Sequence, residues 1–438
     1  MPPVPVPSAL ADRSPATDGA PSDAGTSLPT RRRLFGLAGA LAAGLIGLAA
    51  GATPLLARES FESWRAGFKA HAVRRGVSAE TYDRVMDAIE PDTRVFALQR
   101  AQPEFQEALW QYLNRRVSDW RIVTGRQRAR EEAALLGRLE RDYGVDPYLL
   151  VALWGVESSF GEVIDNPKYM RPVIPALAAL AWGEPRRRRY WEQELTNALR
   201  IVDRGWASPD EMIGSWAGAM GHTQWMPEVW LNVGVDYDHD GRISPFGRPD
   251  DALAGTARYL LKRGKYRAGE AWGCEVRLPG GLSRSHMNGR AWRTYAEWAS
   301  LGVLRADGAP FRHPSHRVRL RRPVSGGPAF LTGRNFEAVH SYNPAFSYAL
   351  AIAHLSDRIR GGDPFVQNFP GAEERTPTLA EIQEIQRRLT KLGFDTGGTD
   401  GRVGSTTMRA VGAYQRKVGM KPDGYAGLEL LARLRRGS

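Results

Sequence analysis

The chain of 438 residues contains a single cysteine, Cys274, so it cannot form an intrachain disulfide. This does not assign the chain to a reducing compartment, because the lack of disulfides does not exclude an oxidising one. Repeats of about twenty residues are absent as well, which excludes a solenoid. No recognised nucleic-acid-binding motif is present, so we expect no nucleic-acid partner.

Positive charge, by contrast, is in excess. The formal net charge is +12, which favours an anionic partner such as nucleic acid, a membrane surface or an acidic wall polymer. The basic residues are dispersed, and the one dense run, at residues 186–189, is short. Hydrophobic residues make up 42% and charged residues 25%, which is ordinary for a soluble globular protein with two or three folded units.

The N-terminal segment, residues 1–52, has the features of a disordered leader followed by an export signal. Residues 1–29 are rich in Pro, Ala, Ser and Asp. Two arginines, Arg32 and Arg33, precede an apolar run at 37–50, an order that resembles a twin-arginine signal. We therefore expect a periplasmic protein without stable membrane insertion after cleavage. The alternative is a retained anchor, for which the run is short.

Apolar periodicity predicts a mainly α fold. Residues 58–145 are expected to be helical, and residues 126–143 to form one long amphipathic helix that is capped by Gly144. Further helices are expected at 190–203, 251–263 and 345–359, and strands around 316–332. The sequence thus predicts a helical protein with a minor β component.

Another helix is predicted to begin at Asp146, with Pro147 at its first position, and to end at Gly161. Helical spacing places Glu157 near its end, beside the apolar residues one turn earlier. Loss of water there would raise the pKa of the carboxyl and keep it protonated, as a general acid requires. The alternative is an ordinary glutamate on the solvated flank of a half-buried helix.

The C-terminal part is predicted to be a separate small domain. Residues 361–377 are rich in Gly, Pro and Glu and are expected to form a linker. Thr378 and Glu381 make a capping box in front of an apolar helix, and Ser405 begins a second helix. About sixty residues, 378–438, then form the domain.

Three blocks in order resemble the lytic murein transglycosylase B family, whose catalytic domain is similar to goose-type lysozyme. The first is Trp-Gly-Val-Glu-Ser-Ser-Phe-Gly at residues 154–161. The second is Ser-Trp-Ala-Gly-Ala-Met-Gly-His-Thr-Gln-Trp-Met-Pro at 215–227, and the third combines Ser-Tyr-Asn at 341–343 with Tyr-Ala-Leu-Ala-Ile at 348–352. The resemblance covers residues 58–360 and implies a lysozyme-like (α+β) catalytic domain.

The resemblance implies a role for each matched residue. Glu157 would be the acid/base, and Ser215 and Gln224 would contact the sugars. The residues expected to line the groove are Tyr112, Tyr259, Tyr342, Asn343 and Tyr348. For each tyrosine the alternative is core packing with a satisfied hydroxyl. The chain departs from the commoner pattern with Trp225 for Phe and Glu228 for Ser, and the role of Glu228 is left open.

A short acidic loop has the spacing of an EF-hand, which predicts a structural Ca²⁺ site. Asp236, Asp238 and Asp240 occupy positions one, three and five, and Gly241 occupies the sharp turn. Position twelve is a glycine, so the usual bidentate ligand is missing. The family resemblance implies closure by Asp251, or by its neighbour Asp250, with Arg242 contributing its carbonyl. The alternative is a plain turn, and no cofactor is expected for the chemistry itself.

The C-terminal domain is similar to the three-helix peptidoglycan-binding domain that often accompanies wall enzymes. The resemblance rests on Ile-Gln at 385–386, Leu-Gly at 392–393, Asp-Gly at 400–401, Tyr-Gln at 414–415 and Asp-Gly at 423–424, in this order. Isolated Asp-Gly pairs only form turns, so the order carries the match. It implies peptidoglycan glycan strands as the partner.

The implied reaction is cleavage of the β-1,4 bond between N-acetylmuramic acid and N-acetylglucosamine, with 1,6-anhydromuramic acid as product. One carboxylate would suffice, whereas most glycosidases need two. A hydrolytic muramidase remains an alternative, with Glu162, Asp165 or Glu228 as the second carboxylate. A catalytically silent wall-binding scaffold is another. We expect a monomer.

Overall fold

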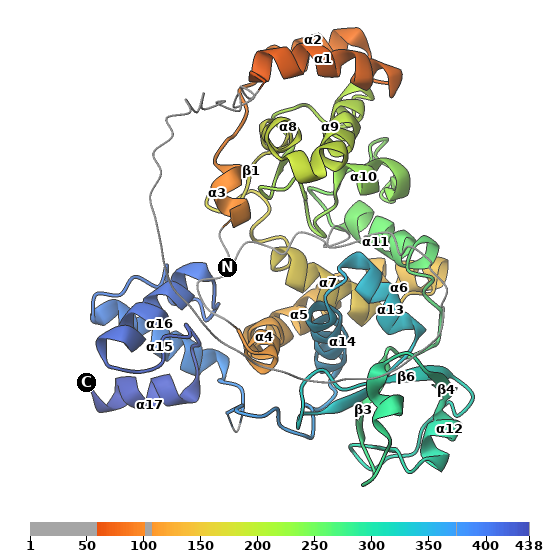
Figure 1. The fold of residues 1–438 in the computed structure, drawn as a ribbon, viewed down its shortest axis with the longest axis vertical. Coiled ribbons are helices and arrows are strands. Elements are labelled where there is room, and N and C mark those ends of the chain that lie inside the picture. Colours follow the sequence, from red (N-terminus) through yellow and green to blue (C-terminus); the bar gives the residue numbers. More distant parts are fainter. Residues whose placement is uncertain (1–58, 101–106, 374, 438) are drawn as a thin grey trace, which may run out of the picture.

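The computed structural model describes residues 59–100, 107–373 and 375–437, so the predicted export signal lies outside the described residues. Helices dominate, and two small sheets accompany them (Figure 1). Across the described residues, no helix combines the length and apolar character needed to cross a membrane. The prediction of a mainly α fold with a minor β component is confirmed.

One group of helices forms the upper part of Figure 1, where α8 and α9 pack on α1 and α2. Its core consists of buried aromatic and aliphatic side chains, with Trp191, Trp225 and Trp230 at most 1% exposed. A two-stranded sheet lies at its edge. The elements are α1 (Phe61–Arg74), α2 (Ala79–Met86), α3 (Val95–Arg100), β1 (Arg171–Pro172), α8 (Val173–Gly183), the 3-10 helix Pro185–Arg187, α9 (Arg188–Asp203), β2 (Ile213–Gly214) and α10 (Pro227–Val233).

A second group surrounds α7, which is buried along its length. Helix α14 packs along α7, and α5 packs on both (Figure 1). The elements are α4 (Leu109–Arg116), α5 (Asp119–Glu131), α6 (Ala133–Tyr143), α7 (Pro147–Ser158), α11 (Asp250–Lys262), α13 (Arg334–Tyr342) and α14 (Phe346–Arg360). The predicted helices at 190–203, 251–263 and 345–359 are confirmed within one or two residues at each end.

The single long helix expected at residues 126–143 is wrong, because the chain breaks at Glu132 into α5 and α6. Glu132 leaves helical geometry with φ −98° and ψ 20°. The two halves have different main partners, since α5 packs on α7 and α14, whereas α6 packs mostly on α11 and less on α7. No Pro or Gly marks the break, so periodicity could not show it. The cap at Gly144 is confirmed, with φ 63°.

An antiparallel sheet of five short strands covers one end of this group. Its order is β4-β6-β7-β3-β5, and Trp298 of α12 fills its small core. The predicted strands around 316–332 are β6 (Arg317–Arg321) and β7 (Ala329–Thr332). The other elements are β3 (Gly273–Arg277), the 3-10 helix Arg284–Asn288, β4 (Trp292–Thr294), α12 (Tyr295–Ser300) and β5 (Leu304–Arg305).

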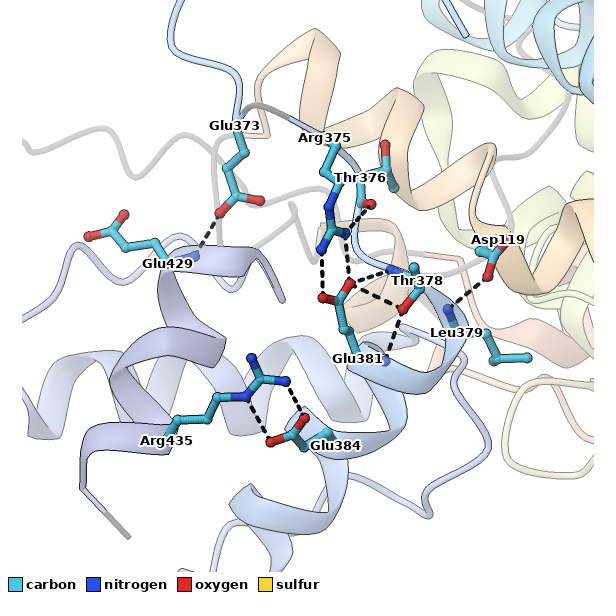
Figure 2. A network of polar contacts seen from close by, with 10 residues as sticks. All are labelled: Asp119, Glu373, Arg375, Thr376, Thr378, Leu379, Glu381, Glu384, Glu429 and Arg435. Atoms are coloured by element: carbon cyan, nitrogen blue, oxygen red, sulfur yellow. Dashed lines mark hydrogen bonds and ion pairs between the residues drawn. The ribbon is translucent and has the colours of Figure 1, made fainter. Parts of the chain in front are cut away.

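Three helices with their own core form the C-terminal part: α15 (Leu379–Lys391), α16 (Ser405–Lys417) and α17 (Leu428–Arg436). The predicted capping box is present, because the Thr378 hydroxyl accepts the Glu381 amide and the Glu381 carboxylate accepts the Thr378 amide (Figure 2). The Leu379 amide donates to Asp119 of α5 across the boundary, at 2.9 Å. The C-terminal helices therefore lie against the group of helices around α7.

The segment expected to be a linker makes extensive contacts. Phe369 is 8% exposed and belongs to the core around α7. Phe365 stacks on His354 of α14, with ring centroids 3.8 Å apart. The amides of Val366 and Gln367 donate to the Glu275 carboxylate on β3, at 2.6 and 2.8 Å. Residues 364–369 therefore pack against the core around α7 and against β3.

These contacts predict that a chain ending at Ala372 is more stable than one ending at Asp363. The shorter chain loses the half-buried Phe365 ring and the buried Phe369 ring, and removal of a buried ring costs on the order of 3 kcal/mol of unfolding free energy. Thermal unfolding of the two truncated proteins measures the difference. Equal melting temperatures would show that residues 364–372 contribute nothing to the fold.

Candidate active site

Helix α7 forms because both its start and its composition favour it. Asp146 accepts the Tyr148 amide at 2.9 Å as N-cap, and Pro147 occupies the first position. Every residue from Leu149 to Ser158 is buried. A helix that is apolar all round must lie inside the protein, and α7 is accordingly the central helix of its group.

The chain leaves α7 through strained backbone. Ser159, Phe160 and Gly161 all have positive φ, at 55°, 61° and 87°, which is costly for the two residues with a Cβ. Packing maintains this conformation, because the Phe160 ring lies against Gly155. A Cβ at Gly155 would approach the ring to 2.4 Å. Such strain persists only where the surroundings over-determine it, and it lies directly after Glu157.

Two buried arginines satisfy the carbonyl end of α7. Arg121 donates from Nε to the Gly155 carbonyl at 3.2 Å, and Arg116 donates from Nη1 to the Val156 carbonyl at 3.4 Å. Both residues are buried: Arg121 is 7% exposed and Arg116 is 2% exposed. The last carbonyls of a helix carry partial negative charge, which these guanidinium groups offset. Arg116 thereby brings a positive charge close to Glu157.

Glu157 is 1% exposed. The Tyr348 hydroxyl of α14 donates to its Oε1, whereas Oε2 is buried with no hydrogen-bond partner among the described residues. Burial raises the pKa of Glu157 to about 7, against the opposing effects of the Tyr348 hydrogen bond and the Arg116 charge. The predicted desolvated carboxyl is therefore present, and the alternative of a solvated flank is wrong.

Ser215 and Gln224 lie in the loop after β2, and both are buried. The Ser215 hydroxyl accepts the Ala219 amide at 3.1 Å, which closes the loop. Gln224 has φ 55°, and its side-chain amide donates to the Gly221 carbonyl at 3.0 Å. Its Oε1 is buried without a partner among the described residues. This loop thus carries a second unsatisfied acceptor besides that of Glu157.

Tyr342, at the end of α13, connects this loop to α11 and α13. Its hydroxyl donates to the Thr223 carbonyl at 2.6 Å. Tyr259 packs edge-on against it with centroids 5.0 Å apart, and donates to the Ser341 carbonyl at 2.9 Å. Asn343 is 2% exposed, and its side chain accepts the Ala345 amide. Both tyrosine hydroxyls are satisfied within the protein, and their contact with substrate stays a prediction.

The remaining predicted groove residue, Tyr112 on α4, is half-buried. The guanidinium groups of Arg115 and Arg116 lie 5.3 and 5.6 Å from its ring centroid. Among the predicted groove residues, Tyr348 contacts Glu157 directly, through the hydrogen bond from its hydroxyl. The roles of the others in sugar binding remain predictions.

His222 was not predicted, although it lies inside the second sequence block. Trp154 Nε1, which can only donate, contacts His222 Nδ1 at 3.0 Å. His222 Nε2 therefore carries the proton and donates to the Gly247 carbonyl at 2.8 Å. Burial lowers the pKa of His222 and so favours this neutral form. The residue joins α7 to the end of the acidic loop.

The three candidates for a second carboxylate lie in other settings. Glu228 forms an ion pair with Arg263, and Glu162 pairs with Arg402 of the C-terminal part at 2.7 Å. Asp165 is exposed. A further glutamate that the sequence did not indicate, Glu194, accepts the Glu228 amide at 3.0 Å, and burial raises its pKa to about 7. No hydrogen bond joins any of them to Glu157 among the described residues.

The acidic loop brings three carboxylates together. Oxygens of Asp236, Asp238 and Asp251 lie within 4.8 Å of one another. Asp236 Oδ1 is buried and has no hydrogen-bond partner among the described residues. A bound cation would give this oxygen a partner. Asp240 is not part of this group, and its carboxylate accepts the Arg242 amide at 2.8 Å. The donor set therefore fits a hard divalent cation.

Comparison with known proteins agrees with this architecture. The transglycosylase SLT domain family matches residues 60–357, and a peptidoglycan binding domain family matches residues 378–434. The chain is 29% identical over 229 residues to membrane-bound lytic murein transglycosylase B of Escherichia coli K12, covering 51% of this chain and 60% of that protein. The chain thus spans less than two thirds of this curated relative.

Two solved structures are similar over more of the chain. SltB3 from Pseudomonas aeruginosa in complex with NAG-anhNAM-pentapeptide is 38% identical with a TM-score of 0.67, covering 86% of this chain and 100% of that one. Slt35 from Escherichia coli in complex with calcium is 25% identical with a TM-score of 0.57, covering 68% and 92%. The predicted lysozyme-like catalytic domain with a three-helix C-terminal domain is confirmed. This chain belongs to the transglycosylase SLT domain family.

Proposed function

We propose that this protein is a lytic transglycosylase that cleaves the β-1,4 bond between N-acetylmuramic acid and N-acetylglucosamine in peptidoglycan. The observation that carries the proposal is the buried Glu157 carboxyl, which has one unsatisfied oxygen and whose pKa is raised by burial to about 7. The names of the related proteins, and the NAG-anhNAM-pentapeptide in the complex of SltB3, support the same chemistry.

The mechanism needs only one acid/base. Glu157 gives its proton from Oε2 to the glycosidic oxygen as the bond to C1 breaks, and the N-acetyl group of the muramic acid stabilises the positive sugar. The Glu157 carboxylate then takes the proton of the C6 hydroxyl, whose oxygen bonds to C1. The products are the 1,6-anhydromuramic end and the free hydroxyl of the leaving strand, with Glu157 protonated again.

Neighbouring side chains favour this cycle. Tyr348 donates to Oε1, which leaves the proton of the neutral acid on Oε2. Arg116 favours the carboxylate form between the two proton transfers, since its charge acts to lower the pKa of Glu157. The buried Oε1 of Gln224 needs a donor, and a sugar hydroxyl or N-acetyl amide of the substrate supplies one. We therefore assign Ser215, Gln224 and Tyr348 to the substrate groove.

A hydrolytic reaction is the second candidate, and the surroundings of Glu157 argue against it. Inverting and retaining glycosidases place a second carboxylate several ångströms from the first. Glu228 and Glu162, which could serve, are both held in ion pairs with arginines. The C6 hydroxyl, by contrast, arrives attached to the substrate and has a high effective molarity.

We also propose a structural Ca²⁺ at Asp236, Asp238 and Asp251. The unsatisfied Asp236 Oδ1 supports it, as does the calcium complex of the related Slt35. The ion would hold the loop that ends at Gly247, whose carbonyl accepts from His222. Its role would be to stabilise the loop, and no catalytic step requires it.

The remaining features complete the proposed protein. Residues 378–438 would bind peptidoglycan and raise the local substrate concentration for the catalytic part, residues 58–360. Residues 361–377 would connect them, although part of this segment packs on the catalytic side. Residues 1–52 would direct the chain to the periplasm, where we propose that it acts as a monomer.

The proposed mechanism predicts a loss of activity as the pH rises through about 7. Because the pKa of Glu157 is raised, its acid form is present below that pH and is lost above it. Arg116→Met removes a charge that lowers this pKa, so the alkaline limb of kcat/KM should move upward by about one pH unit. Arg116→Lys retains the charge and should leave the limb near its wild-type place. An unmoved limb in the Met variant would reduce Arg116 to a packing role.

A further prediction concerns the reaction product. Sacculi digested in ¹⁸O-labelled water should yield anhydro-terminated muropeptides without label, because water takes no part in forming the new bond. Mass spectrometry detects the label. Reducing ends with ¹⁸O at C1 would instead establish hydrolysis.

Glu157→Gln provides the control for both experiments. The amide keeps the acceptor for Tyr348 but has no transferable proton, so product release should fall to the background level. The variant should also unfold at a higher temperature than the wild type above pH 7. There the wild type must bury a charged carboxylate, since a raised folded-state pKa stabilises only while the group is protonated. Near-normal product release from this variant would end the assignment of Glu157.

Another prediction concerns calcium. Added Ca²⁺ should raise the melting temperature of the wild type, because it binds only the folded loop. Asp238→Asn should abolish the rise by removing a charge from the triad, whereas the exposed Asp210→Asn should preserve it. A wild-type melting curve that calcium leaves unchanged would reduce the loop to a plain turn.

A further inference from the structure

A large cavity lies away from Glu157. It has a volume of about 770 Å³ and opens between the far end of α14, strand β3 and residues 362–366. Leu149 of α7 lines it, and Glu157 follows Leu149 by eight residues, or roughly 12 Å of helix. The cavity and the candidate active site therefore lie toward opposite ends of α7.

The walls of this cavity carry an excess of negative charge, although the chain as a whole is positive. Two of its arginines are already paired, Arg360 with Asp146 and Arg305 with Asp307. The acidic side chains that line it outnumber the basic ones: Glu140, Asp146, Glu270, Glu275, Asp307, Asp357 and Asp363 against Arg305, Arg312 and Arg360. A cationic group is therefore favoured inside.

His354 and Asp357 lie one turn apart on α14, and both line the cavity. His354 is only 8% exposed, and its imidazole makes no hydrogen bond among the described residues. Burial lowers its pKa to about 3, so the ring is neutral and one nitrogen is free to accept. Among the described residues, the Asp357 carboxylate accepts one hydrogen bond, from Trp272 Nε1 to Oδ2 at 2.7 Å. A neutral His354 nitrogen and one Asp357 carboxylate oxygen can therefore each accept a hydrogen bond from a ligand.

Other ligands fit less well. Among the described residues, the only group of three metal-ligating side chains is in the acidic loop, so His354 and Asp357 are not arranged for a metal ion. The thiol of Cys274, which also lines the cavity, has its pKa raised to about 12 by burial and is not a nucleophile. Arg312 lines the cavity and forms no ion pair among the described residues. Its guanidinium group can therefore pair with a carboxylate of the ligand.

We propose that this cavity binds a zwitterionic peptide, with Asp357 and His354 receiving its primary ammonium group and Arg312 its carboxylate. In a protein that acts on peptidoglycan, such a peptide is the amine-bearing stem peptide of a wall strand, so this identification rests on the proposed function. A stem peptide held here would tether a strand on the side of α7 away from the bond that is cut.

Isothermal calorimetry of the full-length protein tests the site, with the free peptide L-Ala-γ-D-Glu-L-Lys-D-Ala-D-Ala as probe. The probe has no glycosidic bond, so binding is measured independently of catalysis. Binding should weaken about tenfold when the lysine amine is acetylated, because the charge-assisted contact with Asp357 is lost. Equal affinity for the two peptides, or no binding of the first, would overturn the proposal.

Variants locate the site. Asp357→Asn retains an acceptor for Trp272 but removes the charge, and should weaken binding about tenfold. His354→Phe should weaken it several-fold while keeping the stack on Phe365. The exposed Asp210→Asn should bind like the wild type. Melting temperatures verify folding, and unchanged affinity in both folded cavity variants would contradict the assignment.

A competition experiment separates this site from the substrate groove. Saturating glycan fragments bound to Glu157→Gln should leave the affinity for the peptide unchanged. Displacement of the peptide by glycan would show that the peptide occupies the groove, and the cavity proposal would fail. The proposed function would instead be contradicted by product release from Glu157→Gln. That outcome is independent of the peptide-binding measurements.

Discussion

The burial of the Glu157 carboxyl at the carbonyl end of α7 constrains everything packed around it. A carboxyl group without water must be neutral or must be given partners, and here it has one donor, Tyr348, and one unsatisfied oxygen. The helix carbonyls beside it would add further negative charge, and the buried guanidinium groups of Arg116 and Arg121 bind them. As a result, the pKa of Glu157 lies near 7, and the carboxyl can lose and regain its proton during a reaction.

The same helix connects the other parts of the molecule. Through Trp154 and His222 it reaches Gly247, at the end of the acidic loop, so an ion in that loop would stiffen a segment bonded to α7. Beyond the strained turn at Ser159 and Phe160, Glu162 pairs with Arg402 of the C-terminal helices. At its other end α7 borders the cavity of His354 and Asp357. The proposed active site, the acidic loop and the C-terminal helices are therefore all connected to α7 or to the turn that follows it.

Much of this arrangement could be read from local patterns. Apolar periodicity placed α9, α11 and α14, and the Asp146-Pro147 start and the Thr378–Glu381 box placed two helix beginnings, because each signal depends on neighbours in the chain. The break at Glu132 was missed, since it arises from the different partners of α5 and α6 rather than from a helix-breaking residue. The contacts of Phe365 and Phe369 were missed for the same reason, in a segment whose composition is typical of a linker.

The sequence by itself determined which helix carries the acid, that its surroundings are apolar, and which residues recur in family order. Those properties reside in chain neighbours three or four positions apart. Only the tertiary structure decided what Glu157 touches, because Tyr348 is 191 residues away and Arg116 belongs to another helix. It also decided that Glu228 and Glu162 form ion pairs with arginines. The position of Asp240 outside the group of Asp236, Asp238 and Asp251, and that of His354 at a cavity, likewise depend on the tertiary structure. Charge pairing and burial depend on distances that chain spacing does not record.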